Sequence, residues 1–140
     1  MLADGYELLV ETPGVEEFLA LRALAGMTRR TVEGAAIGLP NTLFGVVIRV
    51  QGKLVGMGRI VGDGGLAFQV VDIAVDPEHQ GRGLGKAIVG RLMEYVEETV
   101  PGGAQVSLMA DGPAKYLYAK FGFVETAPES VGMDLPVRYR

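Results

Sequence analysis

The sequence lacks cysteine and tryptophan and has a single histidine, His79. Without cysteine the chain forms neither disulfides nor thiolate metal sites, and one histidine excludes a histidine-rich zinc or copper centre. We therefore expect no metal. No apolar run approaches the ~20 residues that a membrane-spanning helix needs, so we also expect no membrane partner.

An excess of basic residues and a targeting segment are missing as well. The formal net charge is −4, whereas a nucleic-acid-binding domain is typically basic. Residues Met1–Asp4 show no basic region leading into an apolar stretch, so no signal peptide is expected. These features predict a cytoplasmic protein that binds no nucleic acid. At 140 residues, the whole chain (1–140) is expected to form a single domain.

Glycine is abundant instead, with 21 residues in the chain, about twice the usual share of roughly 7%. The pattern of apolar residues predicts an α/β or α+β fold with a single sheet. The expected elements are a strand at Tyr6–Glu11, helices at Val15–Ala25 and Arg29–Leu39, strands at Thr42–Val50, Leu54–Val61 and Leu66–Val75, a helix from Gly83 to Pro101, a strand at Ala104–Ala110, a helix at Pro113–Phe121, and strands at Phe123–Val124 and Val131–Leu135.

A cluster of glycines lies in Gln80–Lys86, between a strand and the start of a helix. Backbone N–H groups at such a position can converge on an anion, so a phosphate ligand is expected. A Walker A loop does not fit, because only three residues separate Gly81 from Gly85 and Ala87 follows Lys86 where Ser or Thr is needed. The alternating glycines also fail the dinucleotide pattern Gly-x-Gly-x-x-Gly.

The pattern Gln80-x-x-Gly83-x-Gly85 resembles the pyrophosphate-binding signature of the GNAT acetyltransferase superfamily. The strand before it, Asp72–Pro77, is similar to the family's strand at this place. A second segment, Asp111–Phe123, resembles the family's Asn-x-x-Ala…Leu-Tyr-x-Lys-x-Gly-Phe. The resemblance is close from Lys53 to Phe123. It implies a mixed, mostly antiparallel sheet of about six or seven strands flanked by about four helices.

The resemblance implies acetyl-CoA as co-substrate and an acetyltransferase that acts by direct attack on an amine in a ternary complex. The residues implied to bind acetyl-CoA are Ile73, Ala74, Val75, Gln80, Gly81, Arg82, Gly83, Leu84, Gly85, Lys86, Asp111 and Ala114. Asp111 stands where many members of the family have Asn. His79, just before the loop, is expected to be a solvated loop residue.

Two residues are candidates for catalysis. Tyr118 matches the family's general acid, and a phenol of pKa about 10 is protonated at neutral pH and can donate to the leaving sulfur. Asp72 is the only acid inside its predicted strand, so it is either a general base or a hydrogen-bonded strand residue that orders the loop. Gln69 occupies a region where some members carry a catalytic Glu, so a water relay is a further route for the proton.

The acceptor is expected to be a small-molecule primary amine. Arg29 and Arg30 lie in the region that lines the family's acceptor pocket, and paired arginines could hold a carboxylate or phosphate of the acceptor. Other segments resemble glucosamine-phosphate and plant-type arylalkylamine acetyltransferases. A protein or peptide amine acceptor and a non-catalytic acyl-CoA sensor are the alternatives. The apolar stretch Val131–Tyr139 would permit a homodimer by exchange of the C-terminal strand.

Overall fold

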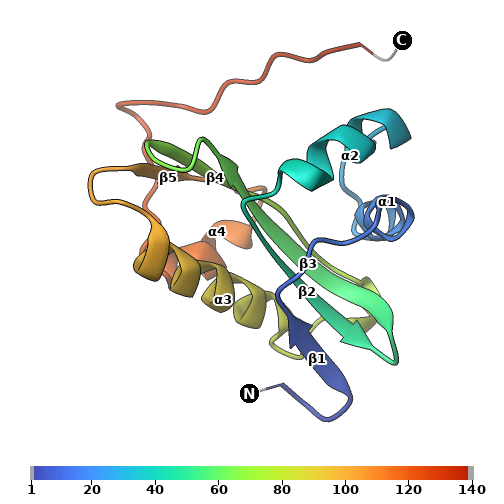
Figure 1. Ribbon diagram of the computed structural model, residues 1–140. Helices are drawn as coiled ribbons and strands as arrows, with labels where there is room; N and C mark the ends of the chain where they lie inside the picture. Colours follow the sequence, from blue (N-terminus) through green and yellow to red (C-terminus); the bar gives the residue numbers. More distant parts are fainter. Residues whose placement is uncertain (1, 139–140) are drawn as a thin grey trace. The chain divides into compact units, whose positions relative to one another are not determined.

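The computed structural model describes residues 2–138, which form two compact units divided between Leu108 and Met109. In the first unit, five strands form one sheet in the order β1-β2-β3-β4-β5 (Figure 1). The strands are β1 (Tyr6–Leu9), β2 (Phe44–Val50), β3 (Lys53–Gly62), β4 (Ala67–Val75) and β5 (Gln105–Ser107). Neighbours are antiparallel up to β4, whereas β4 and β5 are parallel. The prediction of a single mixed, mostly antiparallel sheet is confirmed.

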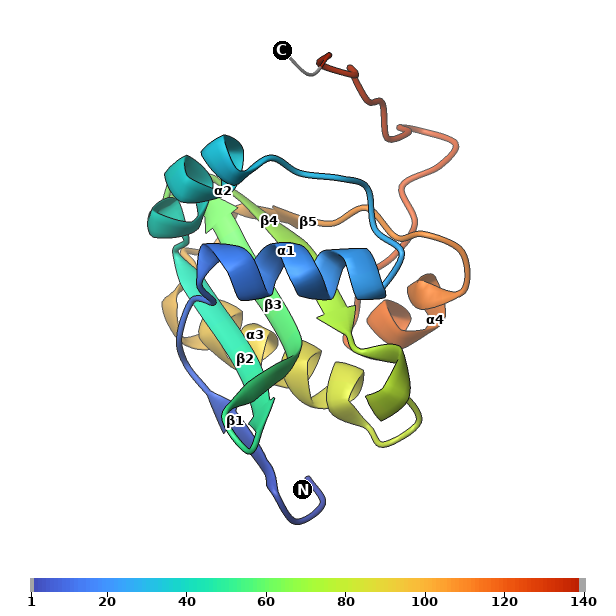
Figure 2. The same cartoon turned by 90° about the vertical axis from the view of Figure 1, so that its right-hand side faces the viewer.

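The resemblance implies about four α-helices, and residues 2–138 contain four. They are α1 (Val15–Leu24), α2 (Val32–Gly38) and α3 (Leu84–Thr99) in the first unit and α4 (Ala114–Ala119) in the second. The first unit also has two 3₁₀ turns, η1 (Leu39–Asn41) and η2 (Pro77–His79). Helices α1 and α2 cover one face of the sheet and α3 covers the other (Figure 2). Within the described residues, no helix combines the length and apolar character needed to cross a bilayer.

The central strands are apolar on both faces because both faces are covered by helices. In β2, the successive residues Val46, Val47 and Ile48 are completely buried. One core cluster joins α1 and the η1 turn to the sheet, and it contains Phe18, Leu21, Ala35, Leu39, Val47, Leu54, Met57 and Ala74. On the opposite face, α3 buries Ile88 and Leu92 completely. Strand β4, where the candidate site begins, is contacted by helices of both layers.

Strand β4 contains a bulge at Asp72. Ala74 pairs with Met57 and Val71 pairs with Arg59, so β4 has one more residue than β3 between these two pairs. Asp72 takes a left-handed conformation with φ of 58°. Bulges of this kind bend a strand and redirect a side chain, and they are frequent beside active sites. The bulge determines where the Asp72 carboxylate points.

The second unit corrects the predicted number of strands. Residues 2–138 contain five strands, fewer than the six or seven expected, because neither Phe123–Val124 nor Val131–Leu135 forms a strand. Both segments have apolar, β-branched residues, but Val124 and Leu135 are each 85% exposed. Strand propensity alone does not make a strand without a paired neighbour. Tyr139, the end of the apolar stretch that would permit dimerisation, lies outside the described residues.

Candidate functional site

The connection between β4 and α3 contains the predicted glycine loop. Gly81 and Gly83 both have φ of 78°, a left-handed conformation that residues with a side chain adopt only at a cost. A Cβ atom at either position would meet no atom within 4 Å. The two glycines are therefore required by the backbone path, while the space beside them is open.

Helix α3 begins at this loop with its first N–H groups available. Gly83 caps the helix without a side-chain hydrogen bond, and the first turn has no acidic residue. The first backbone hydrogen bond of the helix runs from the Ala87 N–H to the Gly83 carbonyl at 3.0 Å. The N–H groups of Leu84, Gly85 and Lys86 come before this bond and therefore have no carbonyl partner within the helix. These donors, the helix dipole and the exposed Lys86 ammonium together suit an anion such as a pyrophosphate.

Within residues 2–138, the end of the strand that leads into the loop has a backbone edge without a strand partner. Strand β5 pairs with β4 only at Ala67–Gln69, so no residue of β5 pairs with Ile73–Val75. At the end of the strand, the Gln80 side-chain amide donates to the Val75 carbonyl at 3.4 Å. An extended ligand could therefore add to this edge through main-chain hydrogen bonds.

His79 is more than a solvated loop residue. Its Nδ1 lies 2.7 Å from the Tyr6 hydroxyl, and the two rings meet edge to face. The guanidinium of Arg82 lies 6.0 Å from the centre of the Tyr6 ring. The loop is thus attached to β1 through one tyrosine, a contact that the sequence pattern did not predict.

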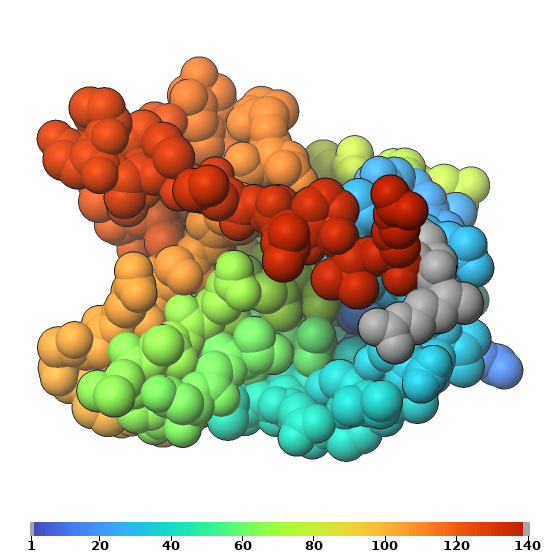
Figure 3. All heavy atoms as spheres, turned by 90° about the horizontal axis from the view of Figure 1, so that it is seen from above, coloured from blue at the N-terminus to red at the C-terminus, as the bar shows by residue number. Residues whose placement is uncertain are grey.

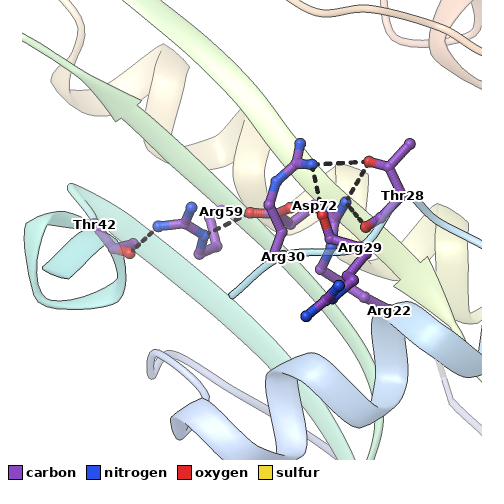
Figure 4. Close-up of polar contacts among 7 residues, drawn as sticks. All are labelled: Arg22, Thr28, Arg29, Arg30, Thr42, Arg59 and Asp72. Carbon is purple, nitrogen blue, oxygen red and sulfur yellow. Dashed lines mark hydrogen bonds and ion pairs between the residues drawn. The ribbon is translucent and has the colours of Figure 1, made fainter. Parts of the chain in front are cut away.

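A cluster of arginines surrounds Asp72 on the face of the sheet that α1 covers (Figure 4). The Arg22 Nη1 donates to Asp72 Oδ1, and the Arg59 Nε donates to Asp72 Oδ2 at 2.9 Å. The Arg22 Nη2 also donates to the carbonyl and the hydroxyl of Thr28, at 2.8 and 3.1 Å. Arg30 reaches the same hydroxyl through its Nη1 at 2.9 Å. We call Arg22, Arg30, Arg59, Asp72 and Thr28 the arginine cluster.

Arg22 is buried, and Asp72 and Arg59 are mostly buried. The side chains of Arg22, Asp72 and Arg59 are 4%, 9% and 11% exposed. Burial lowers the pKa of Arg22; the charge of Asp72 opposes that shift, whereas the positive charges of Arg30 and Arg59 add to it. Arg22 and Arg59 therefore share one carboxylate with the charge of Arg30 close by, and the cluster has an excess of positive charge.

For Asp72, the sequence leaves two interpretations, a general base or a hydrogen-bonded strand residue. The geometry favours the second interpretation, because each carboxylate oxygen accepts a bond from a different arginine. Its catalytic role stays a prediction. Arg29 and Arg30, the predicted acceptor-binding pair, lie in the connection between α1 and α2; Arg30 belongs to the cluster, and Figure 4 draws Arg29 next to it.

Sequence reasoning missed Arg22 and Arg59, although each leaves a signal. Arg22 follows Phe18 by four residues and Val15 by seven, so it falls on the apolar face of α1. Arg59 is the only charged residue within Val55–Val61 of β3. A charged residue on a buried face needs a partner, and Asp72 was the available carboxylate in the neighbouring strand.

The second unit contains the predicted general acid. Tyr118 lies on α4 and is 9% exposed, and burial together with the negative charge of Asp111 raises the pKa of its phenol. Ala114 begins this helix, and its N–H donates to the Asp111 carbonyl at 3.2 Å. Tyr116 on the same helix is 67% exposed, which separates the two tyrosines clearly.

The described part of the chain contains no cluster of side chains suited to bind a metal ion. No group of three or more His, Cys, Asp or Glu side chains within residues 2–138 could hold a metal ion. The donors that the molecule presents are instead backbone N–H groups at the loop and guanidinium groups at the cluster, both of which suit negatively charged ligands.

The fold places a glycine-rich loop between a mixed sheet and a helix, and comparison with known proteins identifies the class to which it belongs. The model of the acetyltransferase (GNAT) domain matches residues 41–125. This protein belongs to the GNAT acetyltransferase family, as the resemblance in its loop and in Asp111–Phe123 predicted. A solved Staphylococcus aureus structure, of a protein of unknown function described as a probable acetyltransferase, is 44% identical and superposes with a TM-score of 0.90, over 94% of this chain and 99% of that one.

Two plant proteins are similar as well. A GCN5-related N-acetyltransferase 2, chloroplastic, of Arabidopsis thaliana is 39% identical over 79 residues, which are 56% of this chain and 30% of that protein. A histone acetyltransferase of Glycine max is 35% identical over 128 residues, which are 84% of this chain and 54% of that protein. The chain thus spans from about a third to about half of the length of these two relatives.

Proposed function

We propose that this protein is an acetyl-CoA-dependent N-acetyltransferase that transfers an acetyl group to a primary amine of a small molecule. The observation that supports this most is the loop between β4 and α3. Two left-handed glycines with open space beside them lead into a helix start whose N–H groups have no capping side chain. Membership of the GNAT family, whose enzymes use acetyl-CoA, supports the same donor.

The residues of the loop and of β4 fit this donor. Gln80–Lys86 would hold its pyrophosphate through backbone N–H groups, and the backbone edge of Ile73–Val75 would hold its extended arm. When bound, acetyl-CoA supplies an activated thioester that an amine can attack. The chain has no cysteine, which favours direct attack over a covalent acyl-enzyme. In the second unit, Asp111 and Ala114 are the further candidates for contact with the donor.

Tyr118 is the proposed general acid, holding the proton that the departing sulfur needs. Its burial raises the pKa of the phenol, so the proton is retained throughout the neutral range. A free thiol titrates near 8.5, below the ordinary tyrosine pKa of about 10. Because burial raises the pKa of Tyr118 above this ordinary value, loss of its proton should reduce turnover only above about pH 10. The incoming amine must lose its own proton first, through Asp72 or a water relay.

The test compares the two tyrosines of α4 by the same substitution. Tyr118→Phe should lower turnover by about 10²–10⁴-fold, with acetyl-CoA binding retained, because it removes only the donated proton. Tyr116→Phe is the matched control, since Tyr116 is exposed on the same helix, and its turnover should equal that of the wild type. Thiol release with a panel of amines measures turnover, and thermal melting measures binding.

The melting experiment separates the donor from other ligands. Acetyl-CoA at 100 times its dissociation constant should stabilise the protein by about 2.7 kcal/mol. A shift with ATP and magnesium but none with acetyl-CoA would contradict the proposal. Equal turnover of Tyr118→Phe and wild type would remove Tyr118 from the mechanism.

A protein or peptide amine is the second candidate acceptor. The name of the Glycine max relative, a histone acetyltransferase, favours it. Binding of acetyl-CoA without thiol release from any small amine would support this candidate or a non-catalytic acyl-CoA sensor. Acetylation of a peptide panel, followed by mass spectrometry, would then distinguish the enzyme from the sensor.

A further inference from the structure

The arginine cluster has a charge imbalance that its own residues do not neutralise. The charges that act on Arg22 are one carboxylate, Asp72, and two further guanidinium groups, Arg30 and Arg59. At another ion-pair cluster of the first unit the negative charges are in excess, because the single guanidinium of Arg49 pairs with both Glu11 and Glu17. Like charges held together at a partly buried place repel one another unless an anion lies between them.

The cluster is also held in place at an energetic cost. The Nε of Arg22 is buried and has no hydrogen-bond partner among residues 2–138. An unsatisfied buried donor is destabilising, and functional sites are among the places where proteins retain such a cost. Two threonines fix the orientation of the arginines, since Thr28 accepts from Arg22 and Arg30, and Thr42 accepts from the Arg59 Nη1 at 2.7 Å.

Part of the cluster remains available to a ligand. Arg30 is exposed, and its hydrogen bonds within the described chain all come from Nη1, to Thr28 at 2.9 Å and to the Arg29 carbonyl at 3.3 Å. Arg59 uses its Nε and Nη1 for Asp72 and Thr42, which leaves Nη2. A guanidinium presents its donors in a planar fork that matches carboxylate and phosphate oxygens.

The cluster adjoins the proposed donor site through the chain itself. Asp72 directly precedes Ile73–Val75, the segment of β4 proposed to hold acetyl-CoA, and the bulge turns its carboxylate toward the arginines. An acceptor with its amine at this part of β4 could therefore place a second group at Arg30 and Arg59. The ligand expected there must be negatively charged, because the cluster has two more cations than anions.

We propose that the acceptor amine carries an acidic group, a carboxylate or a phosphate, and that Arg30 and Arg59 bind this group. This inference rests on the proposed acetyltransferase function. Arg22 and the two threonines are positioning residues, which hold Arg30 and Arg59 in place without contacting the acceptor. The exposed Arg30 determines specificity and is the residue to test, because its replacement leaves the buried ion pairs of Asp72 intact.

The experiment uses pairs of amines that differ in one acidic group. O-phosphoethanolamine is compared with ethanolamine to test phosphate, and β-alanine is compared with propylamine to test carboxylate. For each pair, kcat/KM from thiol release gives a ratio of acidic to neutral acceptor. Comparing this ratio between variants cancels differences in the intrinsic reactivity of the amines.

The wild type should prefer the acidic member of at least one pair, and that pair identifies the group. Arg30→Gln should reduce the preference by about ten- to a hundredfold, the contribution of a charge-assisted hydrogen bond. The KM for acetyl-CoA should stay unchanged. Arg91→Gln is the matched control, since Arg91 lies on α3, outside the cluster, and pairs with Glu94. Its preference should equal that of the wild type.

The outcomes separate this inference from the function on which it rests. Turnover without a preference for either acidic amine, or a preference that survives in Arg30→Gln, overturns the inference and leaves the acetyltransferase function standing. A higher KM for acetyl-CoA in Arg30→Gln also overturns it, because the cluster would then bind the donor. No thiol release from any amine rejects the proposed small-amine function and this inference together.

Discussion

The first unit offers negative charge two environments built in different ways, the glycine loop and the arginine cluster. The loop uses backbone N–H groups from one run of the chain, Gln80–Lys86, and needs no side chain. The cluster uses guanidinium groups from α1, from the connection before α2 and from β3, gathered around one residue of β4. The loop is local in sequence, whereas the cluster exists only after folding.

The two environments also differ in what holds them. The loop is open, with no atom near the missing Cβ positions of Gly81 and Gly83, so its geometry depends on backbone conformation. The cluster is buried, and its geometry depends on ion pairs removed from water. Changes in the loop should therefore affect ligand binding more than folding. Changes in the buried part of the cluster should affect folding first.

Asp72→Asn should have the largest effect on stability. Removal of the carboxylate charge leaves Arg22 and Arg59 buried without an anion, so the free energy of unfolding should fall by about 3–5 kcal/mol. Asn tolerates the left-handed conformation as Asp does, so the backbone is not the cause. Chemical denaturation of the purified protein measures the loss.

This substitution also decides between the two interpretations of Asp72. A residue that acts only as a general base would lose turnover but keep its stability when changed to Asn. The control is Asp63→Asn, in the exposed turn between β3 and β4, where Asp63 Oδ1 accepts N–H bonds from Gly65, Leu66 and Ala67. An amide oxygen can accept the same bonds, so stability there should fall much less than in Asp72→Asn.

The same contrast explains how much of the fold the sequence predicts. The hairpin at Gln51 and Gly52 was predictable because a short segment with glycine joins two β-rich runs, and in the structure both residues adopt positive φ. The fate of the C-terminal segments was not predictable in this way. Val131 and Leu135 have strand composition, yet they are 65% and 85% exposed, because a strand depends on a neighbour that composition does not specify.

The functional site also has parts that local sequence predicts and parts that depend on the folded structure. The glycine spacing predicted the loop, and the position of Tyr118 in its motif distinguished it from Tyr116, which the structure leaves exposed. Only two of the five members of the arginine cluster, Arg30 and Asp72, were predicted from the sequence. Its other members depend on the bulge in β4, whose register no local pattern reveals.

The exposure of several apolar residues is another feature that composition alone does not predict. Val32 and Ile37 of α2 are 66% and 64% exposed, and Leu66 in the turn before β4 is 76% exposed. The cyan and green segments of Figure 3 show where α2 and this turn reach the surface. Hydrophobicity alone would have placed these three residues in the core. Single exposed apolar side chains are common in folded proteins, so burial must be observed.

Gly83→Ala tests the loop side of the comparison. The new methyl group has room, but the left-handed conformation costs about 1–2 kcal/mol for a residue with a side chain. We expect stability to fall by about 1 kcal/mol, while the dissociation constant for acetyl-CoA, measured by calorimetry, rises about tenfold. Gly102→Ala is the control, because Gly102 also has open space but no positive φ. Unchanged affinity in Gly83→Ala would mean that the loop does not bind the donor.

Glu17→Gln should have the smallest effect and tests the balanced counterpart of the cluster. Arg49 donates to both Glu17 oxygens at 2.8 Å, and this pairing, more than the Gly14 N–H, lowers the pKa of Glu17 below 4.5. A lowered folded-state pKa stabilises the protein above pH 4.5, and that contribution is lost as the pH falls through the folded-state value. Glu17→Gln should therefore reduce the free energy of unfolding by about 1 kcal/mol at pH 7, with the difference disappearing in acid.

Glu16→Gln is the control, because Glu16 is an exposed neighbour in the same first turn of α1 and shares only the helix dipole. A pH-independent difference between Glu17→Gln and wild type would show that the pairing with Arg49 contributes through shape and not through charge.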